Sequence, residues 1–256
     1  MNRIADAALA PSAAPLPTRL PAPAVASGGT GRRLSSIDAR AWVTAIGLLL
    51  LAGWELTGLD MTLAHLAGSA HGFALREHWF LDGVMHDGMR RVSWFLALLL
   101  SLGVWWPLGP LKRLGTSRRL QLALTTLLSA FLVSALKGLS TTSCPWDLQA
   151  FGGVARHVSH WWPGADGGPG HCFPAGHAVS GFSFLAGYFA FRHTDRRTAH
   201  RWLAAALAAG LVLGFTQQLR GAHFTSHTLW TAWLCWTFAW AVDRLWPATM
   251  AIEHEL

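Results

Sequence analysis

The chain has 256 residues, of which 52% are hydrophobic and only 13% are charged. An average soluble domain has about 25% charged residues, so this composition excludes a disordered chain, a coiled coil and a disulfide-dense mini-domain, and it argues against an ordinary soluble enzyme. The net charge of +7 comes from charges that lie between apolar runs. We therefore attribute it to membrane topology and expect no nucleic-acid partner.

The two ends of the chain differ in composition from its centre. Residues 1–40 are rich in Ala, Pro, Ser, Gly and Arg and show no hydrophobic period, which predicts a disordered cytoplasmic tail. The first apolar run starts too far into the chain for a secretory signal peptide. We expect a membrane domain over residues 41–246 and a short cytoplasmic tail over residues 247–256.

Six apolar segments approach the length of about 20 residues that a helix needs to cross a bilayer. A seventh stretch, 61–91, is mixed in polarity and predicts a loop with an amphipathic, interface-lying helix around 73–91. The fold class expected is all-α, a polytopic membrane protein with six transmembrane helices. Their segments are 41–59, 93–110, 119–137, 176–192, 202–219 and 227–246.

The distribution of Lys and Arg predicts the orientation of these helices. If the N-terminus is cytoplasmic, most of the 20 Lys and Arg residues fall on the cytoplasmic side, as the positive-inside rule requires. Both termini are then cytoplasmic. The outer face is then shared by Lys137, the loop 138–175, His177 and the segment 220–227.

A Lys, an Arg and several His at one surface suit phosphoryl transfer. Cations stabilise the charge on the oxygens of the transferring group. One His can attack phosphorus to form a phospho-histidine, and a second can protonate the leaving oxygen. Because the cations already supply positive charge, this chemistry needs neither a metal nor another cofactor.

Three segments carry a family resemblance. PAGH at 174–177, KGLSTTSCP at 137–145 and GAHFTSH at 221–227 are similar, in order and spacing, to the second, first and third motifs of the type 2 phosphatidic acid phosphatase superfamily. The resemblance covers about residues 90–245. It implies a six-helix membrane phosphatase bundle whose active site opens toward the periplasm or lumen.

The resemblance also implies roles for individual residues. His223 corresponds to the nucleophile, and His177 corresponds to the general acid. A helix N-terminus at His177 would in addition attract an anion through its free N–H groups. The phosphate is expected to be held by Lys137, Arg220, Gly176 and Ala175.

Four positions depart from the family pattern and mark a divergent member. Cys144 and Gln217 stand where the motifs carry Arg, Ala175 stands for a Ser, and His227 stands for the Asp that supports the nucleophile. His227 can accept a hydrogen bond but brings no negative charge. A carboxylate from elsewhere is then expected to assist, with Asp147 and Asp87 as the candidates, and Arg156 is a candidate replacement for the first-motif Arg.

The cysteines suggest a crosslink, and the cationic residues can also be explained without a role in catalysis. Cys144 and Cys172 both fall in the outer loop, and since the periplasm is oxidising they predict a disulfide that closes a loop of about 29 residues; the alternative is two unrelated thiols. Cys235 is expected to be a small buried residue. Lys137 and Arg220 would otherwise anchor helix ends, and His223 would bind lipid headgroups.

The function expected is an integral membrane lipid phosphatase that works without a metal through a phospho-histidine. Its substrate would be a lipid phosphate monoester or pyrophosphate: a prenyl pyrophosphate, phosphatidylglycerol phosphate, phosphatidic acid or lipid A. The alternatives are a lipid phosphotransferase and a catalytically impaired relative with a binding role. A transporter and a bis-His haem protein fit less well, because the polar residues cluster at one face. No protein partner is evident.

Overall fold

The computed structural model describes residues 38–162 and 164–246. The predictions for most of the N-terminal tail and for the C-terminal tail concern residues 1–37 and 247–256, which lie outside the described residues. The chain divides into two units at residue 36, and all described residues belong to the second, 37–256.

The described part of the chain is mainly helical, with one short antiparallel hairpin. A π-helix (Phe80–Gly88) precedes α3, and short 3₁₀ turns cover Gly109–Arg113, Pro145–Asp147, Gln149–Phe151 and Ser183–Leu185. The helices and strands are α1 (Ala39–Glu55), α2 (Leu59–His65), β1 (Gly68–Ser69), β2 (Gly72–Phe73), α3 (Met89–Leu102), α4 (Thr116–Leu139), α5 (Val179–Phe182), α6 (Ala186–Phe191), α7 (Arg196–Leu219) and α8 (Thr225–Leu245).

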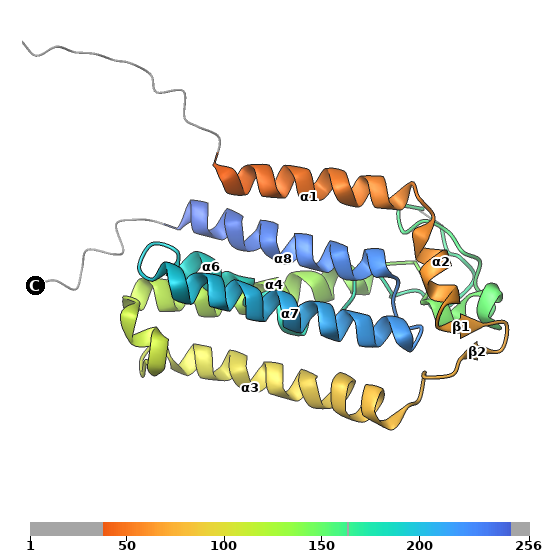
Figure 1. Cartoon of the computed structure of the whole chain (residues 1–256), viewed down its shortest axis with the longest axis horizontal. Helices are drawn as coiled ribbons and strands as arrows, with labels where there is room; N and C mark the ends of the chain where they lie inside the picture. Colours follow the sequence, from red (N-terminus) through yellow and green to blue (C-terminus); the bar gives the residue numbers. More distant parts are fainter. Residues whose placement is uncertain (1–37, 163, 247–256) are drawn as a thin grey trace, which may run out of the picture. The chain divides into compact units, whose positions relative to one another are not determined.

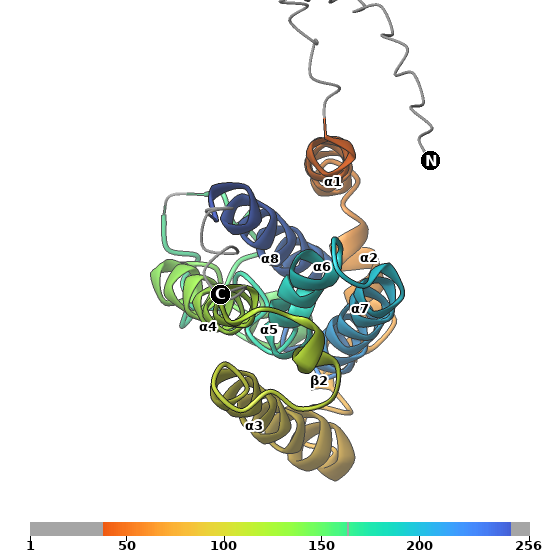
Figure 2. The ribbon, with the colours of Figure 1, turned by 90° about the vertical axis from the view of Figure 1, so that its left-hand side faces the viewer.

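The long helices run side by side as a bundle (Figures 1 and 2). Helices α4, α7 and α8 surround the α5–α6 segment, α1 packs on α8, and α3 packs on α4 and α5. The core between them is aromatic and aliphatic, with Phe182, Leu185 and Phe189 each at most 1% exposed. This arrangement brings the end of α4, the start of α5, the end of α7 and the start of α8 to one end of the bundle (Figure 1).

The predicted continuous helix over 176–192 is wrong in detail, because the structure divides this segment into α5, a 3₁₀ turn and α6. In this irregular segment the backbone lies very close to α7. A Cβ at Gly181 would lie 2.2 Å from the backbone nitrogen of Gly210 in α7, and one at Gly187 would lie 2.3 Å from the ring of Trp202. Glycine is therefore needed where this segment crosses α7.

The segment 61–91 also differs from the predicted interfacial helix around 73–91. It contains the β1–β2 hairpin, a turn, and then the π-helix, which continues directly into α3. The π-helix buries only Leu81. Its polar residues are thereby free to face the loops at the end of the bundle that holds the predicted site.

Two of the described helices, α4 and α7, are long and apolar enough to cross a bilayer. Helices α1 and α2 meet the same test as a pair, but they are bent by 67° at the break between them. Large apolar side chains point outward from several helices, among them Leu49, Phe131 and Phe215, at 71%, 70% and 57% exposed. Such a surface suits lipid, so the helical membrane fold is supported while the number of six spans stays a prediction.

The opposite end of the bundle is held by a buried carboxylate. The side chain of Asp243 in α8 is 1% exposed and pairs with Arg118 at 2.9 Å and with Arg192 at 2.7 Å. The amide of Gln121 donates to the same carboxylate at 3.2 Å. Because the partners come from α4 and from the end of α6, this cluster ties three elements together.

Candidate active site

His177 lies in the turn that leads into α5, where two contacts from α8 fix the backbone. The amide of Ala175 donates to the His227 carbonyl at 3.2 Å, and the hydroxyl of Thr231 donates to the Ala175 carbonyl at 3.1 Å. The predicted phosphate-binding turn, Ala175–His177, is therefore anchored on α8. The Nε2 atom of His177 is buried and has no hydrogen-bond partner among the described residues.

The ring of His177 stacks on a second imidazole that the sequence did not single out. The ring centroids of His86 and His177 are 3.6 Å apart at an angle of 26°. His86 comes from the π-helix, where its Nδ1 lies 3.1 Å from Asp87. Burial, together with the charge of Arg220, lowers the pKa of His86, so its ring is neutral at neutral pH and packs as an aromatic surface.

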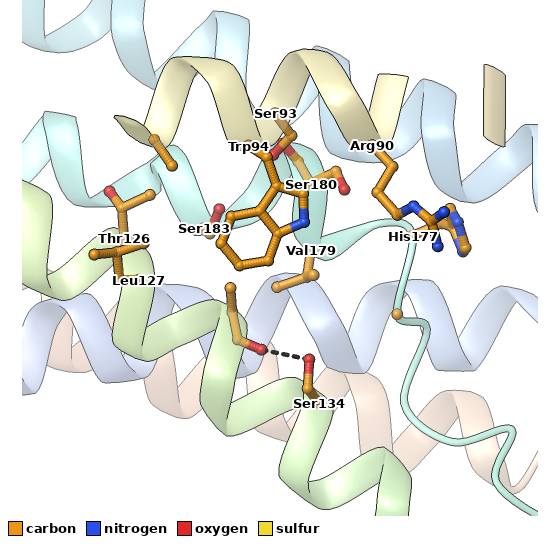
Figure 3. A pocket seen from close by; sticks show the side chains of 13 residues that line it. Arg90, Ser93, Trp94, Thr126, Leu127, Ser134, His177, Val179, Ser180 and Ser183 are labelled. Carbon is orange, nitrogen blue, oxygen red and sulfur yellow. Dashed lines mark hydrogen bonds between the residues drawn. The ribbon is translucent and has the colours of Figure 1, made fainter. Parts of the chain in front are cut away.

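A cavity of about 130 Å³ opens beside His177 between α3, α4 and α5. Figure 3 shows Arg90 and His177 at one end of it and the indole of Trp94 across it. Small polar groups line the rest, including Ser134 and Ser180. The cavity therefore combines apolar lining residues with Arg90 and His177.

Lys137 ends α4 beside the same turn. A Cβ at Gly176 would lie 3.2 Å from Cδ of Lys137, so the bare backbone at this position lets the lysine lie across the turn. The Lys137 ammonium donates to the His171 carbonyl at 2.5 Å. An ammonium carries three N–H donors, so two remain for an anion in this arrangement.

His223 lies in the loop between α7 and α8 and is only 4% exposed. Burial, with smaller effects from the charges of Lys137, His227 and His177, holds its pKa well below the usual range. The imidazole is therefore neutral, which is the form that can attack phosphorus. His223 also lines a second cavity, of about 310 Å³, together with Asp60 and Gln218.

The neighbour of His223 is a disulfide. Cys144 and Cys172 are joined, and the Sγ atom of Cys172 lies 3.5 Å from Nδ1 of His223 and 2.9 Å from the carbonyl oxygen of Ala222. A disulfide sulfur has no proton to donate. If Nδ1 of His223 carries the proton, it directs a weak N–H···S contact to this sulfur, and Nε2 then keeps its lone pair.

His227 makes its hydrogen bond to the backbone of Cys172 and not to the ring of His223. Its Nδ1 donates to the Cys172 carbonyl at 3.1 Å, and its ring centroid is 5.8 Å from that of His223. A carbonyl only accepts, so the proton of the neutral His227 imidazole sits on Nδ1. His227 thus holds the Cys172 backbone, and through it the disulfide, next to His223.

Arg220 lies beside the site with much of its guanidinium engaged. It pairs with Asp82 at 2.5 Å, donates to the Arg76 carbonyl at 2.8 Å and donates to Gln217 at 3.1 Å. A guanidinium has five N–H donors, so two remain without a partner in these contacts. Gln217, at the position of a motif Arg, therefore serves to orient Arg220.

The remaining candidates make no hydrogen bond or ion pair with the His223 ring in the described part of the chain. Asp147 is next to Trp146 in the loop region, where burial raises its pKa. Asp87 pairs with Arg90 at 3.4 Å. The side chain of Arg156 is exposed, and the backbone amide of Arg156 donates to the backbone carbonyl of Asp166. Among the described residues, no carboxylate is hydrogen-bonded to the His223 ring, because the segments carrying these aspartates fold toward other partners.

A carboxylate that the sequence did not suggest pairs with a histidine whose ring contacts that of His227. Glu55, at the end of α1, is 3.5 Å from Nε2 of His160 and accepts from the indole of Trp230 at 2.9 Å. His160 stacks on Phe173 at 3.9 Å, and its ring meets that of His227 edge-on at 6.0 Å. No periodic pattern in the sequence joins α1 to residue 160, since this contact depends on how the outer loop folds over the bundle.

One group of side chains in the described chain has the spacing of a metal site. Ligand atoms of Cys172, His223 and His227 lie within 4.8 Å of one another. Cysteine binds a metal as its thiolate, and the Cys172 sulfur is instead bonded to Cys144. The two imidazoles that remain are too few for a closed structural site, for which zinc takes four ligands, so the donor set does not fit a resident metal ion.

The family model described as PAP2 superfamily matches residues 118–250. The chain belongs to the PAP2 superfamily. The match spans α4 to α8 and so includes Lys137, His177 and His223. No curated protein and no solved structure matches the chain.

The departures from the PAP2 superfamily motifs have a structural counterpart. Cys144, at a motif Arg position, forms the covalent link to Cys172, and His227, at the motif Asp position, binds the Cys172 carbonyl. Cys144 and His227 therefore both bind Cys172, whose sulfur lies beside His223. The family suggests a phosphatase or phosphoesterase activity on lipid-like substrates.

Proposed function

We propose that the protein is an integral membrane lipid phosphatase that hydrolyses a phosphate monoester or pyrophosphate through a phospho-histidine on His223. The substrate is a lipid with an exposed phosphate, such as a prenyl pyrophosphate, phosphatidylglycerol phosphate, phosphatidic acid or lipid A. The enzyme lies in the bacterial inner membrane with both termini in the cytoplasm and its site on the periplasmic side.

The observation that carries this proposal is the grouping of two histidines with cations at one end of the bundle. Lys137 comes from α4, His177 from the turn before α5, and Arg220 and His223 from the α7–α8 connection. Burial is the main cause of the low pKa of His223, and the charges of Lys137, His227 and His177 lower it further. Cations gathered around a neutral imidazole attract a phosphate and hold it for attack.

The reaction follows from these positions. The phosphate is bound by Lys137, Arg220 and the backbone at Gly176. Nε2 of His223 attacks phosphorus, the P–O bond to the lipid breaks, and His177 gives its proton to the leaving lipid oxygen. Water then attacks the phospho-histidine, His177 takes a proton from that water, and inorganic phosphate leaves.

His177 and the substrate meet at the cavity of about 130 Å³. In this arrangement the acyl or prenyl chain lies along the apolar flank formed with Trp94, and the phosphate lies toward Arg90 and His177. The negative charge of the phosphate stabilises the imidazolium that must donate the proton. The apolar flank accepts lipid chains of several kinds, so it selects a lipid over a water-soluble phosphate ester.

The disulfide beside His223 favours one alternative, a relative with weak or lost hydrolysis. In place of a carboxylate, Nδ1 of His223 has Cys172 Sγ at 3.5 Å, and a neutral sulfur stabilises a positive phospho-imidazole less than a carboxylate does. A phosphotransferase is the other alternative, in which a second lipid intercepts the phospho-histidine before water does.

The test is phosphate release from a panel of these lipids by detergent-purified protein in the presence of a chelator. Wild type is compared with His223→Ala and with the control His71→Ala, which removes an exposed histidine of the hairpin. We expect release by wild type and H71A and a loss of at least about 100-fold in H223A. Equal release by H223A would refute the phospho-histidine.

A second measurement separates the alternatives. If wild type releases no phosphate, the same protein is given radiolabelled lipid phosphate together with an unlabelled acceptor lipid. Labelled acceptor identifies a phosphotransferase. Absence of both products, with lipid still bound, identifies a non-hydrolysing relative and overturns the phosphatase proposal.

A further inference from the structure

Another cavity, lined by polar residues, lies at the opposite end of the bundle from His177 and His223. It has a volume of about 360 Å³ and is lined by residues from the start of α1, the end of α6 and the start of α7. Cationic and titratable side chains dominate its lining, which consists of Arg40, Tyr188, Arg192, His193, Arg196 and His200.

The carboxylates closest to this cavity already have partners. Asp38 pairs with Arg40 at 2.5 Å and caps α1. Asp243 pairs with Arg192 at 2.7 Å. Asp195 caps α7 by accepting from the amide of Thr198 at 3.0 Å, and it also pairs with Arg113 on the other side.

Arg196 adds positive charge that these carboxylates do not offset. Within residues 38–162 and 164–246, no carboxylate lies within 4.0 Å of its guanidinium. The Arg196 carbonyl is in hydrogen-bond contact with Nδ1 of His200 at 2.7 Å, so His200 is held against the same turn. The cavity thus combines a free guanidinium, two imidazoles and a phenol.

The electrostatics of the α6–α7 turn agree with an excess of positive charge. Burial lowers the pKa of His193, and the charge of Arg192 lowers it further, in excess of the opposing effect of Asp243. Three arginines therefore line the cavity, while the nearest carboxylates are already paired. Arginine binds phosphate oxygens with paired N–H donors, and a phenol or imidazole can donate to the same group.

We propose that this cavity is a second phosphate-binding site, separate from the candidate active site and able to hold the phosphate of an anionic lipid headgroup or a free phosphate anion. Under the proposed topology it faces the cytoplasmic leaflet, where anionic headgroups meet basic pockets between helices. The site needs no catalytic group, and its occupation does not depend on hydrolysis at His223.

Tyr188 provides a specific reporter, because it is the only tyrosine of the 256 residues and lines this cavity. Protein labelled with 3-fluorotyrosine gives a single ¹⁹F resonance from Tyr188. The full-length protein in a phosphate-free detergent is titrated with inorganic phosphate in one arm and with short-chain phosphatidylglycerol in the other. Short-chain phosphatidylcholine, which has the same phosphate but no net charge, is the lipid control.

Two variants with equal change of charge distinguish a site from a basic surface. Arg196→Gln removes a cavity-lining guanidinium, and Arg197→Gln removes an exposed arginine from the next position of α7, outside the cavity lining. We expect a saturable shift of the Tyr188 resonance whose apparent Kd rises about tenfold in R196Q and less than about twofold in R197Q.

The two arms identify the ligand source. A shift with phosphatidylglycerol alone assigns a lipid headgroup, and a shift with inorganic phosphate at similar concentrations assigns a free anion. No saturable shift in either arm overturns the proposal, and so does an equal weakening in R196Q and R197Q. Since the reporter lies at Tyr188, none of these outcomes depends on whether the active-site proposal holds.

Discussion

The side chain next to the His223 imidazole is a disulfide sulfur. Cys172 brings Sγ to 3.5 Å from Nδ1 of His223, while its carbonyl receives the N–H of His227. The two polar contacts of residue 172 thus connect the candidate nucleophile to the histidine that replaces the motif Asp. The immediate surroundings of the His223 ring therefore include the disulfide between Cys144 and Cys172.

Breaking this link should affect both stability and turnover. The Cys144–Cys172 bond has a sequence separation of 28, for which the chain-entropy model gives about 3–4 kcal/mol of stabilisation. We expect C144S/C172S to unfold at a lower temperature and to lose turnover, because His223 loses its neighbour. Thermal unfolding and phosphate release are measured with and without reductant.

The control for this experiment is Cys235→Ala, which removes the free buried cysteine. Reductant should lower the unfolding temperature of C235A as it does for wild type, and should leave C144S/C172S unchanged. An unfolding temperature of wild type that does not respond to reductant would contradict the prediction.

The pKa of His160 predicts a dependence of stability on pH. Burial lowers this pKa from 6.5 to about 4, so below pH 6.5 the unfolded chain binds a proton that the folded chain does not. The contribution of a neutral His160 is complete above pH 6.5 and is lost as the pH falls toward 4, by up to about 3 kcal/mol.

His160→Phe tests this dependence. The variant keeps a ring against Phe173, on which His160 stacks at 3.9 Å, and removes the titrating group. Between pH 6.5 and 4, we expect the unfolding temperature of H160F to fall less than that of wild type. Parallel pH profiles for the two proteins would show that His160 does not carry the effect.

At the scale of elements, the crossing of α5 and α7 depends on glycine. Gly181 and Gly210 bring the two backbones together, and Gly214 of α7 meets Thr228 of α8 in the same way, since a Cβ there would lie 2.2 Å from the threonine side chain. Small residues at such crossings allow the close packing that stabilises helix association in lipid. The position of the His177 turn follows from this packing, because α5 begins at Val179.

Gly181→Ala is therefore expected to destabilise the protein. The added methyl group would meet the backbone nitrogen of Gly210 at 2.2 Å, and overpacking of this kind costs about 1–3 kcal/mol. Gly53→Ala in α1 is the matched control, since nothing lies within 4 Å of its Cβ position and alanine favours a helix. The unfolding temperatures of G181A, G53A and wild type are compared in detergent; equal values for G181A and wild type would refute the requirement for glycine.

At the scale of the whole molecule, the two ends of the bundle differ in chemistry. One end gathers His177, Lys137 and His223, while the other gathers the Asp243 cluster and the cavity lined by Arg196. The candidate active site therefore lies at one end of the bundle only. The proposed orientation puts the histidine-rich end outside the cytoplasmic membrane.

Thiol labelling of intact cells checks this orientation. Ser159 lies in the outer loop and Thr194 lies in the α6–α7 turn, and both are exposed. We expect a membrane-impermeant maleimide to label S159C in intact cells and T194C only after permeabilisation. The wild-type protein is the background control, because its one free cysteine is buried. The reverse pattern would place the site in the cytoplasm.

Much of the family assignment could be predicted from short motifs. PAGH at 174–177 and GAHFTSH at 221–227 indicated the superfamily, and the match over residues 118–250 confirms it. These motifs can be recognised in the sequence because the characteristic residues of each lie within a few consecutive positions. The roles assigned to His177 and His223 stay predictions until turnover is measured.

Apolar periodicity determined that the chain is mainly helical and that charge lies between apolar segments. Tertiary structure alone decided which groups meet: His86 on His177, Asp82 on Arg220 and Glu55 beside His160. Each of these contacts joins residues far apart in the chain, so local periodicity carries no signal for it. The sequence of a helix shows which of its faces is apolar. Which other helix it packs against, and in which register, depends on how all the elements pack together.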